Sequence, residues 1–154
     1  RGVKLRGLLR RLLPPFSNRP AVCREPESPL PTPAQVDALL AYLPQLYPHG
    51  VAITPSEVRP GSEWPVYFEE VRAFYAELSA DCWTDFSYSI QVSNERIRDP
   101  VYIARADLRE LRSLLTYCNR GERFCDGHWG AMIRLGCVRN ILERLAQLRQ
   151  RMQP

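Results

Sequence analysis

Apolar residues spaced three and four positions apart recur along most of this chain, and two short motifs mark where helices should begin. Thr32-Pro33-Ala34-Gln35 and Asp107-Leu108-Arg109-Glu110 both match the capping box. In this motif a short polar residue and an acid or amide three positions later bind the first free N–H groups of a helix. The leucines that follow each box then fall on one face of a helix. The sequence therefore predicts a compact, mainly α domain.

Prolines and glycines divide this domain into four to five predicted helices. Proline interrupts a helix because it lacks an N–H group, and glycine is the usual residue just after a helix end. Asp126 is the predicted N-cap of the short fourth helix, and Pro44 is the predicted end of the first. The predicted helices cover about residues 32–44, 65–78, 107–121, 126–136 and 138–152, and the predicted domain covers residues 34–152.

Residues 86–92, from Phe86 to Val92, alternate strictly between apolar and polar side chains. A period of two is typical of a half-buried strand. A strand needs a partner, and the best candidates are residues 51–53 and 101–103. The predicted fold class is therefore mainly α, with at most a small β element around Phe86 and Val92.

The first 33 residues differ from the domain in charge and in pattern. Residues 1–20 carry six positive and no negative charges, whereas the other 134 residues carry 15 positive and 17 negative charges. Residues 1–13 are predicted to form a basic amphipathic helix, which we call the arm. Residues 14–33 contain seven prolines and are predicted to form a linker. An apolar stripe opposed by arginines suits a partner protein, a second copy of the chain, the chain's own domain or an anionic membrane surface, and the arginines alone suit nucleic acid. The predicted partner-binding residues of the arm are Arg6, Leu8, Leu9, Arg10, Arg11 and Leu12.

The turn Arg120-Gly-Glu-Arg-Phe-Cys-Asp-Gly-His-Trp-Gly130 gathers most of the chain's chemically capable side chains between two predicted helices. We favour a structural or docking turn, in which arginines pair with carboxylates and two aromatic rings fill the core. The residues assigned to this role are Arg120, Glu122, Arg123, Phe124, Asp126 and Trp129.

Two other interpretations of the turn remain open. In a catalytic site, Cys125 is the nucleophile and His128 the base, with Asp126 or Glu122 orienting the imidazole. In a metal site, thiolates and an imidazole bind zinc, from the set Cys118, Cys125, His128 and Cys137. The spacing of this set is not typical of a zinc site, and cysteines are common small core residues. We therefore expect no metal and no cofactor.

Several segments together resemble an uncharacterised family of small bacterial domains of unknown function with an RGERFCDGHW-type motif. The likeness covers about residues 34–150, and Cys118 departs from the family pattern, which has an aliphatic residue there. The resemblance implies a bacterial origin and transfers no activity. The matching segments are Tyr67-Phe68-Glu69-Glu70-Val71 with Phe74, Leu114-Leu115-Thr116-Tyr117, Arg120 to Trp129, Gly136, and Ile141-Leu142-Glu143-Arg144-Leu145.

The sequence contains no catalytic or nucleotide-binding signature and no run of the roughly 18 apolar residues that a membrane span requires. Without a secretory signal, its five cysteines are expected as free thiols in the cytoplasm. We predict a non-catalytic protein-interaction or regulatory module that binds a partner protein or itself. The alternatives are a small enzyme or metal-binding protein centred on Cys125 and His128, or a nucleic-acid-associated accessory protein that binds through the arm.

Overall fold

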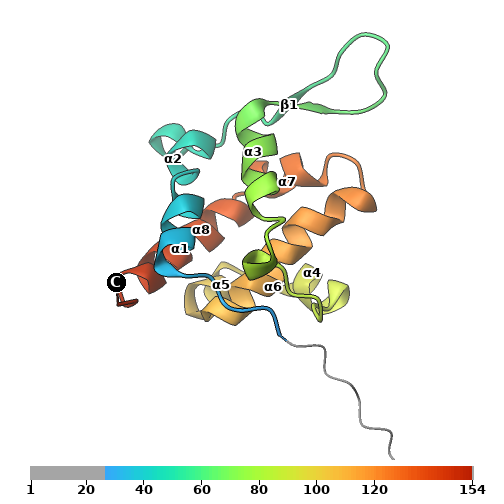
Figure 1. Ribbon diagram of the computed structural model, residues 1–154. Helices are drawn as coiled ribbons and strands as arrows, with labels where there is room; N and C mark the ends of the chain where they lie inside the picture. Colours follow the sequence, from blue (N-terminus) through green and yellow to red (C-terminus); the bar gives the residue numbers. More distant parts are fainter. Residues whose placement is uncertain (1–26, 154) are drawn as a thin grey trace, which may run out of the picture.

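The computed structural model describes residues 27–153, which fold into eight α-helices, three short 3-10 helices and one two-stranded sheet (Figure 1). The mainly α class is confirmed. The arm and residues 14–26 of the linker lie outside the described residues. The α-helices are α1 (Pro33–Leu40), α2 (Leu43–Leu46), α3 (Glu69–Glu77), α4 (Ile90–Arg96), α5 (Pro100–Arg105), α6 (Leu108–Arg120), α7 (His128–Arg134) and α8 (Cys137–Arg149). The remaining elements are η1 (Pro48–Gly50), β1 (Ser56–Glu57), β2 (Val66–Tyr67), η2 (Asp81–Trp83) and η3 (Gly121–Arg123).

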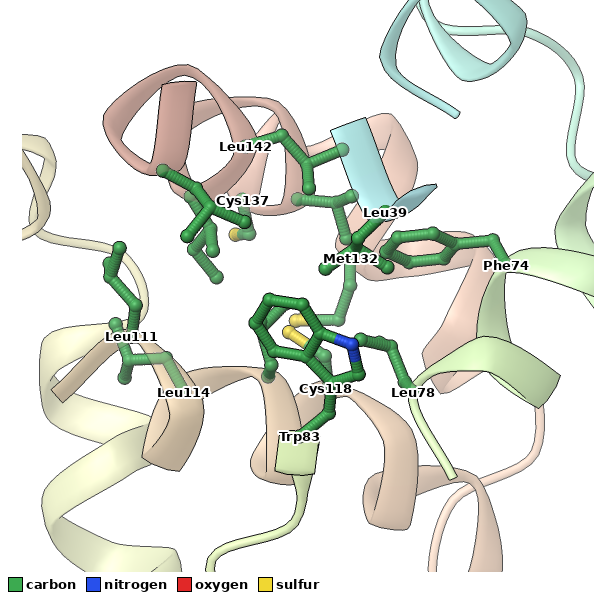
Figure 2. Close-up of a cluster of buried hydrophobic side chains, with 14 of the residues drawn as sticks. Leu39, Phe74, Leu78, Trp83, Leu111, Leu114, Cys118, Met132, Cys137 and Leu142 are labelled. Carbon is green, nitrogen blue, oxygen red and sulfur yellow. The ribbon is translucent and has the colours of Figure 1, made fainter. Parts of the chain in front are cut away.

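The core lies around α8, which packs against α1, α5, α6 and α7. The apolar stripes of α6 and α8 are buried, as their helical spacing predicts. Trp83, from η2, is fully buried in the middle of this core. The side chains around it come from α1, α3, α6, α7 and α8 and include Leu39, Phe74, Leu78, Leu111, Leu114, Cys118, Met132, Cys137 and Leu142 (Figure 2).

Both predicted capping boxes are confirmed. At α1 the Gln35 N–H donates to Thr32 Oγ1, and the Thr32 N–H donates to Gln35 Oε1 over 2.8 Å. At α6 the Glu110 N–H donates to Asp107 Oδ1 over 2.9 Å, and the Asp107 N–H donates to Glu110 Oε2 over 2.8 Å. These contacts join residues three positions apart, which is why sequence alone locates both helix starts.

Three helix predictions need correction. The count of four to five helices is too low, because the short helices α2, α4 and α5 fall in stretches predicted as loop or strand. Pro44 lies in the first turn of α2 rather than ending a helix. Proline is tolerated there because N–H groups in the first turn of a helix have no hydrogen-bond partner within the helix, so the missing N–H of proline costs nothing. The helix predicted from residue 65 begins at Glu69, because Val66 and Tyr67 pair with β1.

The predicted strand at residues 86–92 is also wrong. Asp85 accepts a hydrogen bond from the Ser87 N–H, which makes a turn, and Ser89 accepts one from the Val92 N–H and caps α4. Such local bonds compete with strand pairing. Of the proposed partners, residues 101–103 are helical and residues 51–53 are not in a strand. The small sheet instead joins β1 and β2 antiparallel, with Ser56 opposite Tyr67 and Glu57 opposite Val66.

Candidate functional site

The turn between α6 and α7 depends on two glycines. At Gly121 an added Cβ would lie 2.3 Å from the imidazole of His128, so the chain passes the ring at a distance that only glycine allows. Gly127 has a φ of 84°, a left-handed conformation that glycine adopts at little cost. Through these two positions the chain leaves α6, makes the single turn η3 and enters α7 (Figure 1).

The carboxylate of Glu122 lies at the start of α7. Its Oε1 accepts hydrogen bonds from the Gly127 N–H over 2.9 Å and the Tyr67 hydroxyl over 2.7 Å, and its Oε2 accepts one from the Trp129 N–H over 2.7 Å. A negative charge here also interacts favourably with the helix dipole. The predicted N-cap, Asp126, is wrong: its side chain is exposed and has no hydrogen bond within residues 27–153. Glu122 takes that role because η3 folds it back over the helix start.

Tyr67 connects the β1–β2 hairpin to this turn. Burial raises the pKa of its phenol above the usual value, and the hydrogen bond to Glu122 raises it further. The phenol therefore remains a donor at neutral pH. Its ring also lies against the indole of Trp129, with 5.3 Å between ring centroids. The hairpin, the turn and α7 are thus held together by two side chains of the turn, Glu122 and Trp129.

The two aromatic residues of the turn lie in different surroundings. Trp129 is half-buried and stacks on Tyr75, with centroids 4.4 Å apart and planes 6° apart. Its indole N–H donates to the Asn119 carbonyl over 2.8 Å. Phe124, in contrast, is 76% exposed. The interpretation that both rings fill the core therefore holds for Trp129 and is wrong for Phe124.

The arginines of the turn do not form the expected ion pairs. Within the described residues, neither Arg120 nor Arg123 has a carboxylate oxygen within ion-pair distance. The guanidinium of Arg120 lies over the rings of Phe86 and Tyr88, 5.4 and 5.5 Å from their centroids. This is cation–π geometry. Arg123 is exposed.

A surface cavity of about 440 Å³, here called the turn groove, lies beside these side chains. Sequence reasoning found its turn residues and missed five others: Asn119, which precedes the turn in α6, and Ser79, Asp81, Thr84 and Phe86. Nothing local connects the last four to the turn, because they reach it only through the packing of the segment from the end of α3 to the loop after η2 against α6. The groove is lined by Ser79, Asp81, Thr84, Phe86, Asn119, Arg120, Glu122, Arg123 and Trp129.

The proposed catalytic pair is not assembled. The Cys125 thiol is exposed, and its only hydrogen-bond contact in the described part of the chain is the Asp126 carbonyl, 3.9 Å away. The His128 ring lies against Gly121 and edge-on to Tyr117, and its buried Nε2 has no partner among residues 27–153. Burial lowers the pKa of His128, an effect that the nearby Glu122 charge only partly opposes. The imidazole is therefore neutral and packed, rather than bonded to the thiol.

The four zinc candidates are not brought together either. Cys118 and Cys137 are buried in the core, whereas Cys125 is exposed. Burial raises the pKa of the Cys118 and Cys137 thiols, which favours their protonated forms. Within residues 27–153, no group of three or more histidine, cysteine, aspartate or glutamate side chains could hold a metal ion.

The protein is thus a small helical domain in which Glu122, from the preceding turn, caps the start of α7 beside a surface groove. This chain belongs to the family of unknown function DUF6508, whose model matches residues 31–151. No curated protein and no solved structure matches the chain. Membership of an uncharacterised family is thereby confirmed. Within the described range, no helix has the length and apolar character needed to cross a membrane.

Proposed function

We propose that this protein is a non-catalytic, cytoplasmic protein-interaction module of a bacterial cell, and that the turn groove together with Phe124 is its docking surface. The observation that carries this proposal is that some side chains of the turn are bonded to the protein while another is exposed to solvent. Glu122 and the Trp129 indole N–H are bonded to the protein itself, whereas Phe124 is 76% exposed on a backbone that these bonds hold.

The groove favours a partner segment in which an acidic side chain is next to an apolar one. Arg120 and Arg123 supply two guanidinium groups without ion pairs in the described residues. Phe86 in the groove, and Phe124, which follows Arg123 in the chain, supply exposed rings. Arginine and large aromatic residues carry much of the binding energy at protein interfaces. Because the turn is already held in place, little conformational entropy is lost when it binds.

The same geometry makes the enzyme alternative less favoured. A nucleophile and its base should lie within hydrogen-bond reach of each other. Instead the Cys125 thiol contacts the Asp126 carbonyl, and the His128 Nε2 is buried without a partner in residues 27–153. We therefore expect Cys125→Ser to retain partner binding.

Selection of random displayed peptides on the full-length protein tests this proposal. We expect enrichment of peptides with aspartate or glutamate next to leucine or phenylalanine. Phe124→Ala and Arg123→Gln should weaken the selected peptides by roughly tenfold or more, as expected for central interface residues. Val101→Ala and Arg105→Gln, exposed residues of α5 that do not line the groove, are the matched controls.

Two outcomes would contradict the docking surface. One is that no common sequence class is enriched. The other is that the selected peptides bind Phe124→Ala and Arg123→Gln as tightly as the unaltered protein, or lose affinity equally in the α5 controls. Loss of binding in Cys125→Ser alone would favour a site centred on the thiol.

We also propose that the arm, residues 1–13, recruits or stabilises a partner; it lies outside the described residues, and its sequence pattern supports the proposal. Deletion of residues 1–20 tests it. A lower melting temperature or a changed oligomeric state would indicate docking on the domain or on a second copy. Unchanged stability with lost binding to anionic vesicles or nucleic acid would indicate recruitment. No change in any of these measurements would contradict the proposal.

A further inference from the structure

A second cavity, of about 620 Å³, lies beside the first half of α6 and is here called the α6 cavity. Its walls come from the loop after η2, from α6 and from the residues that precede α1. Asp85 and Arg112 both line it, together with Ser28, Ser87, Ser113 and Phe86. Of these residues only Phe86 also belongs to the proposed docking surface, and neither that surface nor the family match assigns a role to the others.

Asp85 is held as an anion in this cavity. Burial on its own raises the pKa of the carboxyl group, but hydrogen bonds from Ser113 and Ser87 outweigh it, so the net pKa lies below the usual value. Oδ1 accepts from the Ser87 N–H over 2.9 Å and from the Ser87 hydroxyl over 2.8 Å, and Oδ2 accepts from the Ser113 hydroxyl. A carboxylate offers about four acceptor positions, so Oδ2 retains one for a ligand.

Arg112 brings a positive charge to the same cavity. Its side chain is buried, with the residue 5% exposed, and Nη1 donates to the Ser28 carbonyl over 2.8 Å. Its Nε has no partner among residues 27–153, and no carboxylate of that range lies within 4.0 Å of its nitrogens. The Nε is closed to solvent, and the charge of Arg112 acts on Asp85 only at a distance, where it helps to lower the pKa of that carboxyl group. A buried charge without a direct ion pair is costly, so a ligand anion would stabilise the part of the guanidinium that lines the cavity.

The remaining charged residues of the cavity already have partners. Arg109 pairs with Glu27, and Glu110 accepts hydrogen bonds from the Tyr102 hydroxyl and the Asp107 N–H. Asp85 and Arg112 are thus opposite charges that line one cavity without pairing with each other. A simple anion would be repelled by Asp85, and a simple cation by Arg112. A ligand that carries both charges satisfies both residues.

We propose that the α6 cavity binds a free α-amino acid, with its ammonium group on Asp85 and its carboxylate on Arg112. Ser28 and Ser113 also line the cavity. Phe86, which is 57% exposed, gives the amino-acid side chain an apolar surface. An apolar amino acid such as leucine therefore binds more tightly than glycine. The cavity shares Phe86 and Thr84 with the turn groove, but its test requires no protein partner, so failure of this proposal can be distinguished from failure of the docking function.

Calorimetric titration of the full-length protein with leucine and its two half-molecules tests the proposal. Isocaproate has the carboxylate and side chain of leucine without the ammonium group, and isoamylamine has the ammonium group without the carboxylate. We expect leucine to bind at least about tenfold more tightly than either half, and glycine to bind more weakly than leucine. Equal binding of isocaproate, or no binding of any amino acid, would overturn the proposal.

Substitutions assign the two charges. Asp85→Asn should weaken leucine binding by about tenfold or more while leaving isocaproate binding unchanged or stronger, and Arg112→Gln should abolish both. Asp126→Asn and Arg105→Gln are the matched controls, because they remove the same charges at exposed positions that line neither cavity. If Arg112→Gln does not fold, the binding of leucine and of isocaproate to Asp85→Asn still tests whether Asp85 binds the ammonium group. Leucine binding that survives Asp85→Asn unchanged would contradict the assignment.

Discussion

Helices α6 and α7 follow each other in the chain, yet their first turns are stabilised in different ways. At α6 the Asp107 and Glu110 side chains bind each other's N–H groups across three residues. At α7 the cap is Glu122, five and seven residues before the N–H groups that it binds, and Tyr67, 55 residues away, donates to the same carboxylate. The first cap needs only its neighbours in sequence. The second exists only when the hairpin, η3 and α7 are all in place.

This difference determines how a local change should spread. Loss of the Asp107 cap should affect the start of one helix. Loss of Glu122 leaves donors unpaired on the hairpin side and on the helix side of the turn, and it also frees the backbone that presents Phe124. The following changes test this contrast, from the largest expected effect to the smallest.

Glu122→Ala should destabilise the protein by about 2–4 kcal/mol, because it removes the acceptor of three hydrogen bonds at once. The measurement is the free energy of unfolding from chemical denaturation. Asp126→Ala is the matched control and should change stability by no more than about 0.5 kcal/mol, since this carboxylate is exposed and caps nothing. An equal loss in both variants would restore Asp126 as the cap.

Tyr67→Phe should cost about 1–2 kcal/mol, because it deletes one hydrogen bond to a charged acceptor that keeps its other donors. Tyr42→Phe is the control, because its hydroxyl has no hydrogen bond in the described range. A double-mutant cycle with Glu122→Ala should be clearly non-additive, since the two residues share a bond. An additive result would show that the hairpin and the turn are not coupled.

Asp107→Ala should cost about 1 kcal/mol, the usual value of an N-cap, and Asp107→Ser should retain most of the stability. Combined with Glu122→Ala, the loss should be additive, because the two caps share no partner. The free energies of unfolding of the single and double variants provide the check. Strong coupling between the two caps would contradict the view that α6 begins independently of the turn.

Mild acid should weaken the turn through His128. Burial lowers the pKa of this imidazole below 6.5, so the unfolded chain binds more protons than the folded one once the pH falls through that value. Stability should therefore decrease as the pH falls from 7.5 to about 5.5, and His128→Gln should reduce this dependence. The exposed His49 gives the matched control His49→Gln. Asp85, whose pKa is lowered, contributes only at more acidic pH.

The sequence by itself determined the elements whose signals are local. The capping boxes of α1 and α6 and the leucine stripes of α6 and α8 were all predictable, because each depends on residues a few positions apart. The resemblance to an uncharacterised family, stated from the sequence, agrees with the family match over residues 31–151. In these cases the residues that form the sequence pattern are the same residues that form the hydrogen bond or the buried stripe.

Only the tertiary structure decided which groups of the turn face inward. The acidic residues Glu122 and Asp126 were both candidates to stabilise it, and η3 brings Glu122 alone to the start of α7. Phe124 and Trp129 looked equally apolar, but only Trp129 meets rings from α3 and β2. The alternation at residues 86–92 failed because local bonds from Asp85 and Ser89 form a turn and a helix cap instead, and within residues 27–153 no strand lies beside it. For the turn the physical reason is different: each outcome depends on a partner far away in sequence, which the local pattern does not contain.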